Sequence, residues 1–203
     1  MSPPRRRSAA PQLVTGVIET PIGRMIAMAS DAGICVLEFL GGRTAPSVAR
    51  SFARRHGAET VPGTNAHLDR LRAELDGYFQ GKLERFEAPL DLHGTPFQKT
   101  VWRRLARTPY GTTLTYSQLA ARAGRPSAVR AAGHANGRNP ISIVVPCHRV
   151  VGTDGTLHGY GGGLWRKRWL LEFERGESPE SLSAADSSLR SSRRSRRARR
   201  NGR

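Results

Sequence analysis

The sequence predicts an α+β protein with a small N-terminal domain, containing an antiparallel sheet and helices, and a mostly helical C-terminal domain with a helix-turn-helix. Three observations support this fold class. Residues 13–40 hold three short apolar runs separated by turn residues, which is typical of antiparallel strands. From Thr95 onward, helix-capping signals and glycine stops recur at short intervals. The chain has 203 residues, enough for one large domain or two small ones.

The N-terminal domain is placed at residues 12–92, and its first part is strand-like. Apolar runs at 13–19, 25–29 and 34–39 are separated by the turn signals Pro21-Ile22-Gly23 and Ser30-Asp31-Ala32-Gly33. Three such runs in succession predict an antiparallel meander.

Two helices follow the meander. The first, over residues 46–56, has a weak pattern. The second, over residues 66–79, has apolar side chains at three- and four-residue steps, at Leu68, Leu71, Leu75 and Phe79. Such spacing places them on one buried helix face. Residues 86–92 are expected to add a further strand.

The C-terminal domain, placed at residues 93–176, begins with three helices. Thr95-Pro96-Phe97-Gln98 is a capping box with proline at the first helical position, and Pro109-Tyr110-Gly111 ends that helix. Thr115-Tyr116-Ser117-Gln118 opens a second helix through Ala123, and Pro126-Ser127 opens a third that extends to about Asn136. The second and third helices, joined by a tight glycine-containing turn, predict a helix-turn-helix.

The remainder of this domain surrounds a cysteine. The apolar run 141–145 predicts a buried extended segment, and Pro146-Cys147-His148 follows directly. A glycine-rich loop over residues 152–163 then leads into a last helix, over residues 164–175.

Both ends of the chain are polar and basic. Residues 1–11 and 177–203 are predicted to be disordered. Of the formal net charge of +17, eight units come from arginines in 190–203 and three from Arg5–Arg7, which leaves +6 for the body. This distribution favours a polyanionic partner, with nucleic acid first. A tail that only increases solubility is the alternative.

Two further classes are excluded by composition. Cys35 and Cys147 are the only cysteines, which suits a reducing compartment and no disulfide framework. No apolar run approaches the length of a membrane span. We therefore expect a cytoplasmic protein, associated with the nucleoid in a bacterium or with the nucleus in a eukaryote.

A metal site is not expected from the sequence. Cys147 and His148 have no second cysteine or histidine pair at zinc-finger spacing. In the N-terminal part and the segment after it, Cys35, His56, His67 and His93 do not form a convincing ligand set. The prediction is that the site residues hold no metal, and a structural metal in the N-terminal domain stays an open alternative.

Cys147 and His148 are candidate catalytic residues. Only a thiolate attacks efficiently, and a free cysteine with a pKa of about 8.5 is mostly protonated at neutral pH. A neighbouring imidazole can accept the thiol proton, and a carboxylate can orient that imidazole. From the dipeptide alone, a buried structural cysteine and half of a zinc site remain alternatives.

The surroundings of Cys147 are more specific. The stretch Asn-Pro-Ile-Ser-Ile-Val-Val-Pro-Cys-His-Arg-Val at 139–150 resembles the signature of the O6-alkylguanine-DNA alkyltransferases. Phe97-Gln98, Pro109-Tyr110-Gly111, Thr115-Tyr116 and Gly159-Tyr160 flank it in the order of that family. The resemblance covers about residues 12–175 and is strongest from residue 95.

The resemblance implies a DNA-repair reaction. The alkyl group of O6-alkylguanine in double-stranded DNA, with O4-alkylthymine as a further candidate substrate, would move irreversibly to the protein's own cysteine. Each chain would react once, as a monomer and without a cofactor. A non-enzymatic protein that only binds alkyl lesions is the alternative, although such proteins replace the acceptor cysteine. A thiol hydrolase would leave the helix-turn-helix unexplained.

The resemblance also implies catalytic roles. Cys147 would accept the alkyl group, His148 would act as its base through a bridging water, and Glu174 would orient His148. Asn139 would fix the loop that carries the cysteine, and Tyr116 would donate a proton to the departing guanine. Without the resemblance, Glu174 would be interpreted as a solvated helix charge and Tyr116 as a core residue.

Further residues would bind the base and the DNA. The backbone near Val150 would contact the guanine edge, and Tyr160 would form a wall of the pocket. Arg130 would fill the space left by the extruded nucleotide, with Ala131 beside it at the DNA. Small residues around Arg130 would allow the helix to enter a minor groove. The alternative is a helix–helix contact face with Arg130 as a surface charge.

Overall fold

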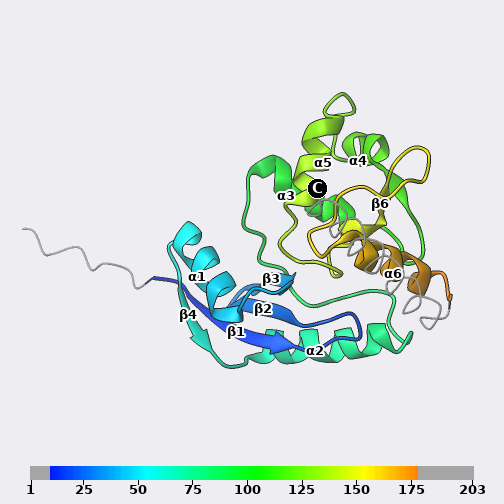
Figure 1. Cartoon of the computed structure of the whole chain (residues 1–203). Helices are drawn as coiled ribbons and strands as arrows, with labels where there is room; N and C mark the ends of the chain where they lie inside the picture. Colours follow the sequence, from blue (N-terminus) through cyan, green and yellow to red (C-terminus); the bar gives the residue numbers. More distant parts are fainter. Residues whose placement is uncertain (1–9, 178–203) are drawn as a thin grey trace, which may run out of the picture.

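The computed structural model describes residues 10–177 and has an N-terminal sheet domain beside a mostly helical C-terminal part (Figure 1). β1 (Gln12–Ile18), β2 (Met25–Ser30) and β3 (Gly33–Phe39) pair antiparallel in sequence order. The predicted meander is therefore confirmed. β4 (Glu59–Pro62) extends the sheet beyond β1, in the order β3-β2-β1-β4.

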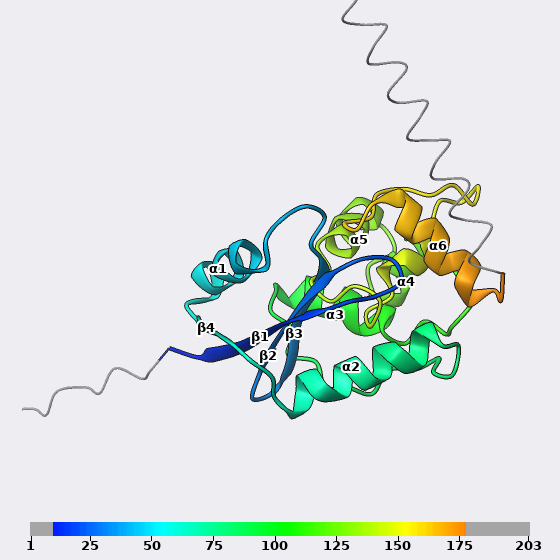
Figure 2. The same cartoon turned by 60° about the horizontal axis from the view of Figure 1, so that its bottom comes forward.

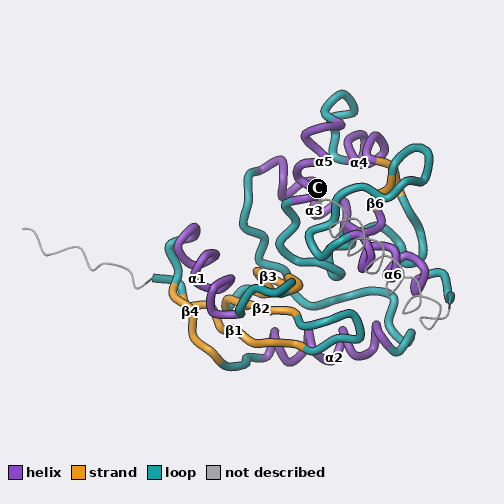
Figure 3. The backbone as a smooth tube through the Cα atoms, viewed as in Figure 1, coloured by secondary structure: helices purple, strands orange, loops and turns teal. Residues whose placement is uncertain are grey.

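Two expectations about the sheet were wrong. β4 was not expected, and it pairs parallel to β1, so the sheet is mixed rather than purely antiparallel. The strand expected at residues 86–92 is absent as a regular element. In its place a single parallel bridge joins Leu90 to Ile34, and the segment otherwise runs over the sheet edge as a loop (Figure 3).

The sheet is covered by one helix on each face, as two views show (Figures 1 and 2). α1 (Ala45–His56) and α2 (Ala66–Phe79) agree with the sequence prediction to within a residue. Alternate strand residues separate into two apolar clusters, because successive side chains of a strand point to opposite faces. The cluster under α1 includes Ile26 and Val36, whereas Ala27 and Leu37 belong to the larger core with α2.

The C-terminal part contains α3 (Pro96–Leu105), α4 (Tyr116–Arg122), α5 (Val129–Gly137) and α6 (Leu164–Glu174). The capping boxes predicted at Thr95 and Thr115 are both formed, each with a side chain–backbone bond in both directions. α4 and α5 make the helix-turn-helix, packed on α3. α5 begins at Val129, three residues later than expected, because the segment opened by Pro126-Ser127 is a turn.

The segment before the cysteine also differs from its prediction. Residues 141–145 are buried as expected, but they form a tight turn rather than an extended run. Ile143 has φ of 72°, a left-handed conformation that is rare for a β-branched residue. The turn leads into a 3₁₀ helix, η1 (Cys147–Arg149), and then β6 (Val150–Val151), which pairs parallel with β5 (Leu114–Thr115).

The predicted disordered ends lie almost entirely outside the described residues. No helix between residues 10 and 177 is long and apolar enough to cross a membrane.

Candidate active site

Cys147 begins η1 at the end of a loop that is held by Asn139. The Asn139 Nδ2 group donates to the Val145 carbonyl at 2.8 Å and lies 3.1 Å from the Cys147 Sγ. The Oδ1 of Asn139 accepts from the Ile141 N–H at 3.0 Å. The Cys147 side chain is buried. Asn139 therefore contacts both the backbone of the loop and the thiol.

The same loop is attached to the N-terminal sheet. The Leu37 N–H donates to the Pro140 carbonyl, and the Ser142 N–H donates to the Leu37 carbonyl, both at 2.8 Å. These bonds form a parallel bridge between β3 and Ile141. The free edge of the sheet thus positions the cysteine loop, a contact across more than a hundred residues that no local pattern indicates.

His148 and Glu174 form a buried pair. The His148 Nε2 lies 2.8 Å from the Glu174 Oε1, although the two residues are 26 positions apart. Both side chains are at most 1% exposed. Glu174 ends α6, and η1 packs against that helix. The carboxylate is therefore placed where it can orient the imidazole, and the interpretation of Glu174 as a solvated charge is wrong.

Glu174 accepts several further hydrogen bonds. The Arg149 guanidinium donates from Nε to Oε2 and from Nη2 to Oε1, both at 2.8 Å. The Tyr78 hydroxyl donates to Oε1 at 2.8 Å, and the Gly111 N–H donates to Oε2 at 3.3 Å. Although burial opposes ionisation, the bonds from His148 and Arg149 lower the pKa of Glu174 to about 2. The carboxylate is therefore ionised at neutral pH.

The protonation of His148 follows from this arrangement. Burial lowers the pKa of His148 below its usual value, despite the opposing effect of Glu174, so the ring is neutral at neutral pH. An ionised carboxylate at Nε2 assigns the ring proton to that nitrogen. Nδ1 is buried and has no hydrogen-bond partner among the described residues. It therefore offers a lone pair that can accept a proton.

Lys167 supplies a positive charge to the site and was not found from the sequence. Its side chain, from α6, is fully buried, and its Nζ donates to the His158 carbonyl at 2.7 Å. Burial lowers the pKa of Lys167 to about 8, and the nearby Cys147 opposes that shift. Burial also raises the pKa of Cys147, while Asn139 and Lys167 lower it. The thiol therefore needs a base before it can attack.

Tyr116 and Val150 are brought together by the short parallel sheet. Leu114 and Thr115 pair with Val150 and Val151, which places the start of α4 next to the end of η1. The half-buried Tyr116 lines a cavity of about 350 Å³, together with Ser117, Val129, Gly152, Thr153, Asp154 and His158. Burial and the proximity of Cys147 both raise the pKa of Tyr116, so its phenol is protonated.

Tyr160 also contacts the histidine. Its ring meets His148 edge-on, with ring centroids 6.5 Å apart, and also contacts Phe39 of β3. Burial and the proximity of Cys147 raise the pKa of Tyr160 well above its usual value. The ring therefore lies between the cysteine loop and the N-terminal sheet.

Arg130 and Ala131 are exposed on the first turn of α5. The interpretation of the small residues of this helix needs a partial correction. Ala132 and Ala135 are buried, and Trp102 of α3 donates to the Ala135 carbonyl at 2.8 Å. One small face of α5 is thus a helix–helix contact, while Arg130 and Ala131 remain on the outer face.

The structure thus brings together all the predicted residues around Cys147, whereas Arg130 and Ala131 stand on the surface of the helix-turn-helix. Sequence reasoning missed Tyr78, Arg149 and Lys167 as members of the site. Only Arg149 had a usable signal, since it follows Cys147-His148 directly. These features define a two-domain protein with a helix-turn-helix and a buried cysteine beside a carboxylate-oriented histidine.

Comparison with known proteins identifies the family within this class. The family model described as "6-O-methylguanine DNA methyltransferase, ribonuclease-like domain" matches residues 13–92. The model described as "6-O-methylguanine DNA methyltransferase, DNA binding domain" matches residues 96–176. The chain belongs to the 6-O-methylguanine DNA methyltransferase family.

Individual relatives agree over nearly their whole length. The methylated-DNA–protein-cysteine methyltransferase of Mycobacterium tuberculosis H37Rv is 42% identical over 83% of this chain and 96% of its own. That of Methanosarcina barkeri is 42% identical over 78% and 94%. The crystal structure of Mycobacterium tuberculosis OGT in complex with DNA superposes with a TM-score of 0.68 and 39% identity, covering 84% of this chain and 98% of that one.

Proposed function

We propose that this protein repairs double-stranded DNA by transferring the alkyl group of O6-alkylguanine to its own Cys147, once per chain. The observation that carries the proposal is the Cys147 loop beside the His148–Glu174 pair, in a member of this family. The protein is a single-turnover methylated-DNA–[protein]-cysteine S-methyltransferase, and it needs no cofactor because the lesion is the alkyl donor.

The reaction is a displacement at the alkyl carbon. The Cys147 thiol loses its proton to the free Nδ1 of His148, through a bridging water, and the ionised Glu174 stabilises the imidazolium that forms. The sulfur then bonds to the alkyl carbon as the bond from carbon to O6 breaks. Tyr116 gives its proton to the departing guanine and becomes a tyrosinate. His148 then releases the proton it took from Cys147, and Tyr116 regains one through solvent, so that both side chains return to their starting states. The products are S-alkylcysteine and unmodified guanine.

The guanine must leave the duplex to reach Cys147, since its O6 substituent is inaccessible inside the helix. The cavity beside Tyr116 supports a role as the entry to the base pocket. The pairing of β5 with β6 sets Val150 next to the start of α4, so the backbone near Val150 would contact the guanine edge. Tyr160, which does not line this cavity, would form a wall deeper in the site, next to His148. The exposed Arg130 occupies the vacated position in the duplex, and Ala131 lies at the DNA beside it. O4-alkylthymine is a further candidate substrate of the same pocket.

The first experiment identifies the acceptor. Duplex DNA with a labelled O6-methylguanine is incubated with the unchanged protein, with Cys147→Ser and with the matched thiol control Cys35→Ser. One label per chain, mapped to Cys147 by peptide mass analysis, is expected for the unchanged protein and for Cys35→Ser. Cys147→Ser should bind the duplex without taking up label. Label on Cys35, or repeated turnover, would contradict the proposal.

A second experiment tests the DNA-binding helix. Arg130→Ala should slow repair of the duplex more than transfer from free O6-benzylguanine, because a free base needs no extrusion. Arg104→Ala, an exposed arginine of α3, is the matched control. Equal losses on both substrates would show that Arg130 acts elsewhere.

The alternative of a protein that only binds lesions is disfavoured by the presence of Cys147 in the loop. We further propose that the protein works as a monomer in the cytoplasm, at the nucleoid, where its DNA substrate lies. The Mycobacterium relatives support a bacterial setting of this kind.

A further inference from the structure

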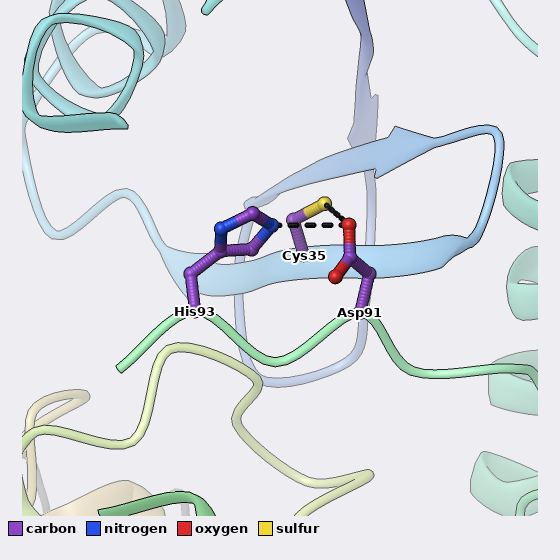
Figure 4. A group of neighbouring side chains, drawn as sticks. All are labelled: Cys35, Asp91 and His93. Carbon is purple, nitrogen blue, oxygen red and sulfur yellow. Dashed lines mark hydrogen bonds and ion pairs between the residues drawn. The ribbon is translucent and has the colours of Figure 1, made fainter. Parts of the chain in front are cut away.

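Two groups of neighbouring polar side chains lie outside the residues assigned to the reaction. The first, in the N-terminal half, is made up of Cys35, Asp91 and His93 (Figure 4). The second, in the loop between β6 and α6, is made up of Asp154, Thr156 and His158. Of the two groups, the second borders the cavity beside Tyr116 and the first does not. The second group therefore lies where an extruded nucleotide would arrive.

The three side chains of the second group form a chain of hydrogen bonds with one direction. The Asp154 Oδ1 accepts from the Thr156 N–H at 3.0 Å and from the Thr156 hydroxyl at 2.6 Å. The His158 Nε2 lies 2.8 Å from the same hydroxyl oxygen. A hydroxyl group has one proton to donate. Because the carboxylate takes that proton, the hydroxyl oxygen accepts from His158, and Nε2 carries a proton.

The other ring nitrogen of His158, Nδ1, has no hydrogen bond to any of the described residues. With Nε2 already protonated, Nδ1 can donate a hydrogen bond only when the ring is an imidazolium, in which both nitrogens carry protons. Asp154 is ionised, since the hydrogen bonds from Thr156 hold its pKa below the usual value. Its carboxylate balances the charge of an imidazolium at the other end of the chain of hydrogen bonds.

The backbone fixes the position of His158. Its carbonyl accepts from the Lys167 Nζ at 2.7 Å, which attaches the residue to α6. The Gly152 N–H donates to the Thr156 carbonyl at 2.8 Å. A Cβ on Gly152 would lie 2.6 Å from both the Asp154 Oδ1 and the Thr156 Oγ1. The absence of a side chain at this glycine therefore allows the polar chain to pack over the backbone.

His158 lies at the outer end of the cavity. Its ring and that of Tyr116 both line the cavity, with 6.3 Å between centroids and a tilt of 52°. Tyr116 is half-buried, whereas His158 is exposed. A nucleotide that is extruded from the duplex enters base first, so its sugar and its phosphates stay at the outer end. His158 is therefore on the side of the phosphates.

We propose that His158, as an imidazolium, donates from Nδ1 to a phosphate group next to the extruded alkylguanine nucleotide. The contact is a charge-assisted hydrogen bond to a phosphate oxygen. Binding takes up one proton from solvent at Nδ1, and no other covalent bond changes. The inference rests on the proposed function, because it takes the alkylguanine to enter beside Tyr116. The contact serves DNA alone, since a free base has no phosphate.

The charged groups around His158 set the pH range in which this contact can be measured. Asp154 stays ionised above its lowered pKa, and Tyr116 stays protonated because burial and the proximity of Cys147 raise its pKa. Arg130, on the neighbouring α5, is an arginine and does not titrate in this range. Burial lowers the pKa of Lys167 to about 8, so measurements are kept between pH 6 and pH 7.5.

DNA binding by the full chain tests the proposal. All proteins carry Cys147→Ser, so that a duplex with O6-methylguanine is bound without being repaired. In this background, His158→Gln keeps a donor for Thr156 but has no group in place of Nδ1. At pH 6 it should bind roughly fivefold to tenfold more weakly than the background, and the deficit should shrink at pH 7.5.

The salt dependence gives a second readout on the same proteins. At pH 6, the slope of log K against log salt should be shallower by about 0.9 for His158→Gln, because one phosphate contact is lost. His67→Gln, which changes a histidine near the start of α2, is the matched control. It should bind like the background in affinity and in slope at both pH values.

A matched change in the DNA identifies the partner. A neutral methylphosphonate replaces the phosphate on the 5′ side or on the 3′ side of the lesion. One of the two duplexes should bind the background protein as weakly as His158→Gln binds the unmodified duplex, and His158→Gln should lose nothing further on it. A methylphosphonate far from the lesion should affect both proteins equally.

Alkyl transfer is followed separately on proteins with Cys147 unchanged. His158→Gln should lose more of its rate on the duplex than on free O6-benzylguanine. Labelling of Cys147 in the unchanged protein decides the proposed function. The role of His158 is overturned, while that function stands, if His158→Gln binds the duplex at pH 6 as tightly as His67→Gln. It is also overturned if the losses from the variant and from each methylphosphonate add in full.

Discussion

Glu174 is the side chain on which most interactions of the site converge. It accepts from His148, from both arms of Arg149, from the Tyr78 hydroxyl and from the Gly111 N–H. Each donor stabilises the carboxylate, and the carboxylate in turn compensates the buried charge of Arg149. The orientation of the His148 imidazole, the proposed base, is thus coupled to the stability of the fold.

This coupling predicts a pH-dependent stability for Glu174→Gln. The folded-state pKa of about 2 lies below the reference value of 4.5. The carboxylate therefore contributes stability that is fully present above about pH 4.5 and is lost as the pH falls toward 2, on the order of 3 kcal/mol. The variant also leaves Arg149 buried without its partner. Urea unfolding should show a deficit of about 3 kcal/mol at pH 7 that shrinks in acid. An equal deficit at pH 7 and at pH 3 would contradict this account.

The charge of Lys167 is expected to affect the reactivity of the Cys147 thiol. Its charge lowers the pKa of Cys147 against the effect of burial. Lys167→Met keeps the length of the side chain but removes the charge, so the fraction of thiolate should fall by up to about tenfold, or about one pKa unit. The pH profile of Cys147 alkylation by iodoacetamide should shift to higher pH. Lys82→Met, which changes an exposed lysine, should leave the profile unshifted.

At the scale of elements, two helices begin with the same capping box, but only one of them carries a proposed catalytic side chain directly after its cap. Thr95 caps α3, and Thr115 caps α4, whose first residue is Tyr116. A lost threonine cap costs about 1 kcal/mol. Thr95→Ala and Thr115→Ala should therefore lower the free energy of unfolding by similar amounts.

Only one of the two caps should matter for the reaction. Thr115→Ala loosens the turn that holds Tyr116, so its transfer rate should fall several-fold, whereas Thr95→Ala should react normally. Denaturant unfolding and single-turnover transfer, measured on both variants, separate the two effects. Equal rates in the two variants would show that the start of α4 does not position Tyr116.

The same elements show which structural features can be predicted from short stretches of sequence. The two capping boxes were predicted because each depends on four consecutive residues. The apolar run 141–145 was assigned as extended, but it forms a turn, since an apolar run records burial rather than conformation. β4 was missed because Glu59–Pro62 becomes a strand only through its pairing with β1.

In the candidate site, too, only the residues that are close in the sequence could be predicted together. Cys147, His148 and Asn139 lie close together in the sequence and could be identified from it. Tyr78 reaches Glu174 across 96 positions, and Lys167 enters the site only because α6 packs against η1. Contacts of this range are fixed by tertiary packing, which a single sequence does not display.

At the scale of the whole molecule, the sheet domain and the C-terminal part share the cysteine loop. β3 carries Leu37, whose backbone holds residues 140–142, and Phe39, whose ring contacts Tyr160. The N-terminal domain contributes no proposed catalytic side chain, although its Tyr78 donates to Glu174. It also supports one edge of the loop. Its role is therefore to hold the loop in the geometry that Asn139 completes.

The charge distribution of the whole chain leads to a last prediction, which concerns DNA binding rather than chemistry. Deleting residues 190–203 removes eight arginines and none of the proposed active-site residues. Each lost phosphate contact should flatten the slope of log K against log salt by about 0.9. The truncated protein should bind DNA more weakly at low salt and with a shallower slope, and it should react with free O6-benzylguanine at the unchanged rate. Unchanged affinity and slope would instead support the interpretation of this tail as a solubilising appendage.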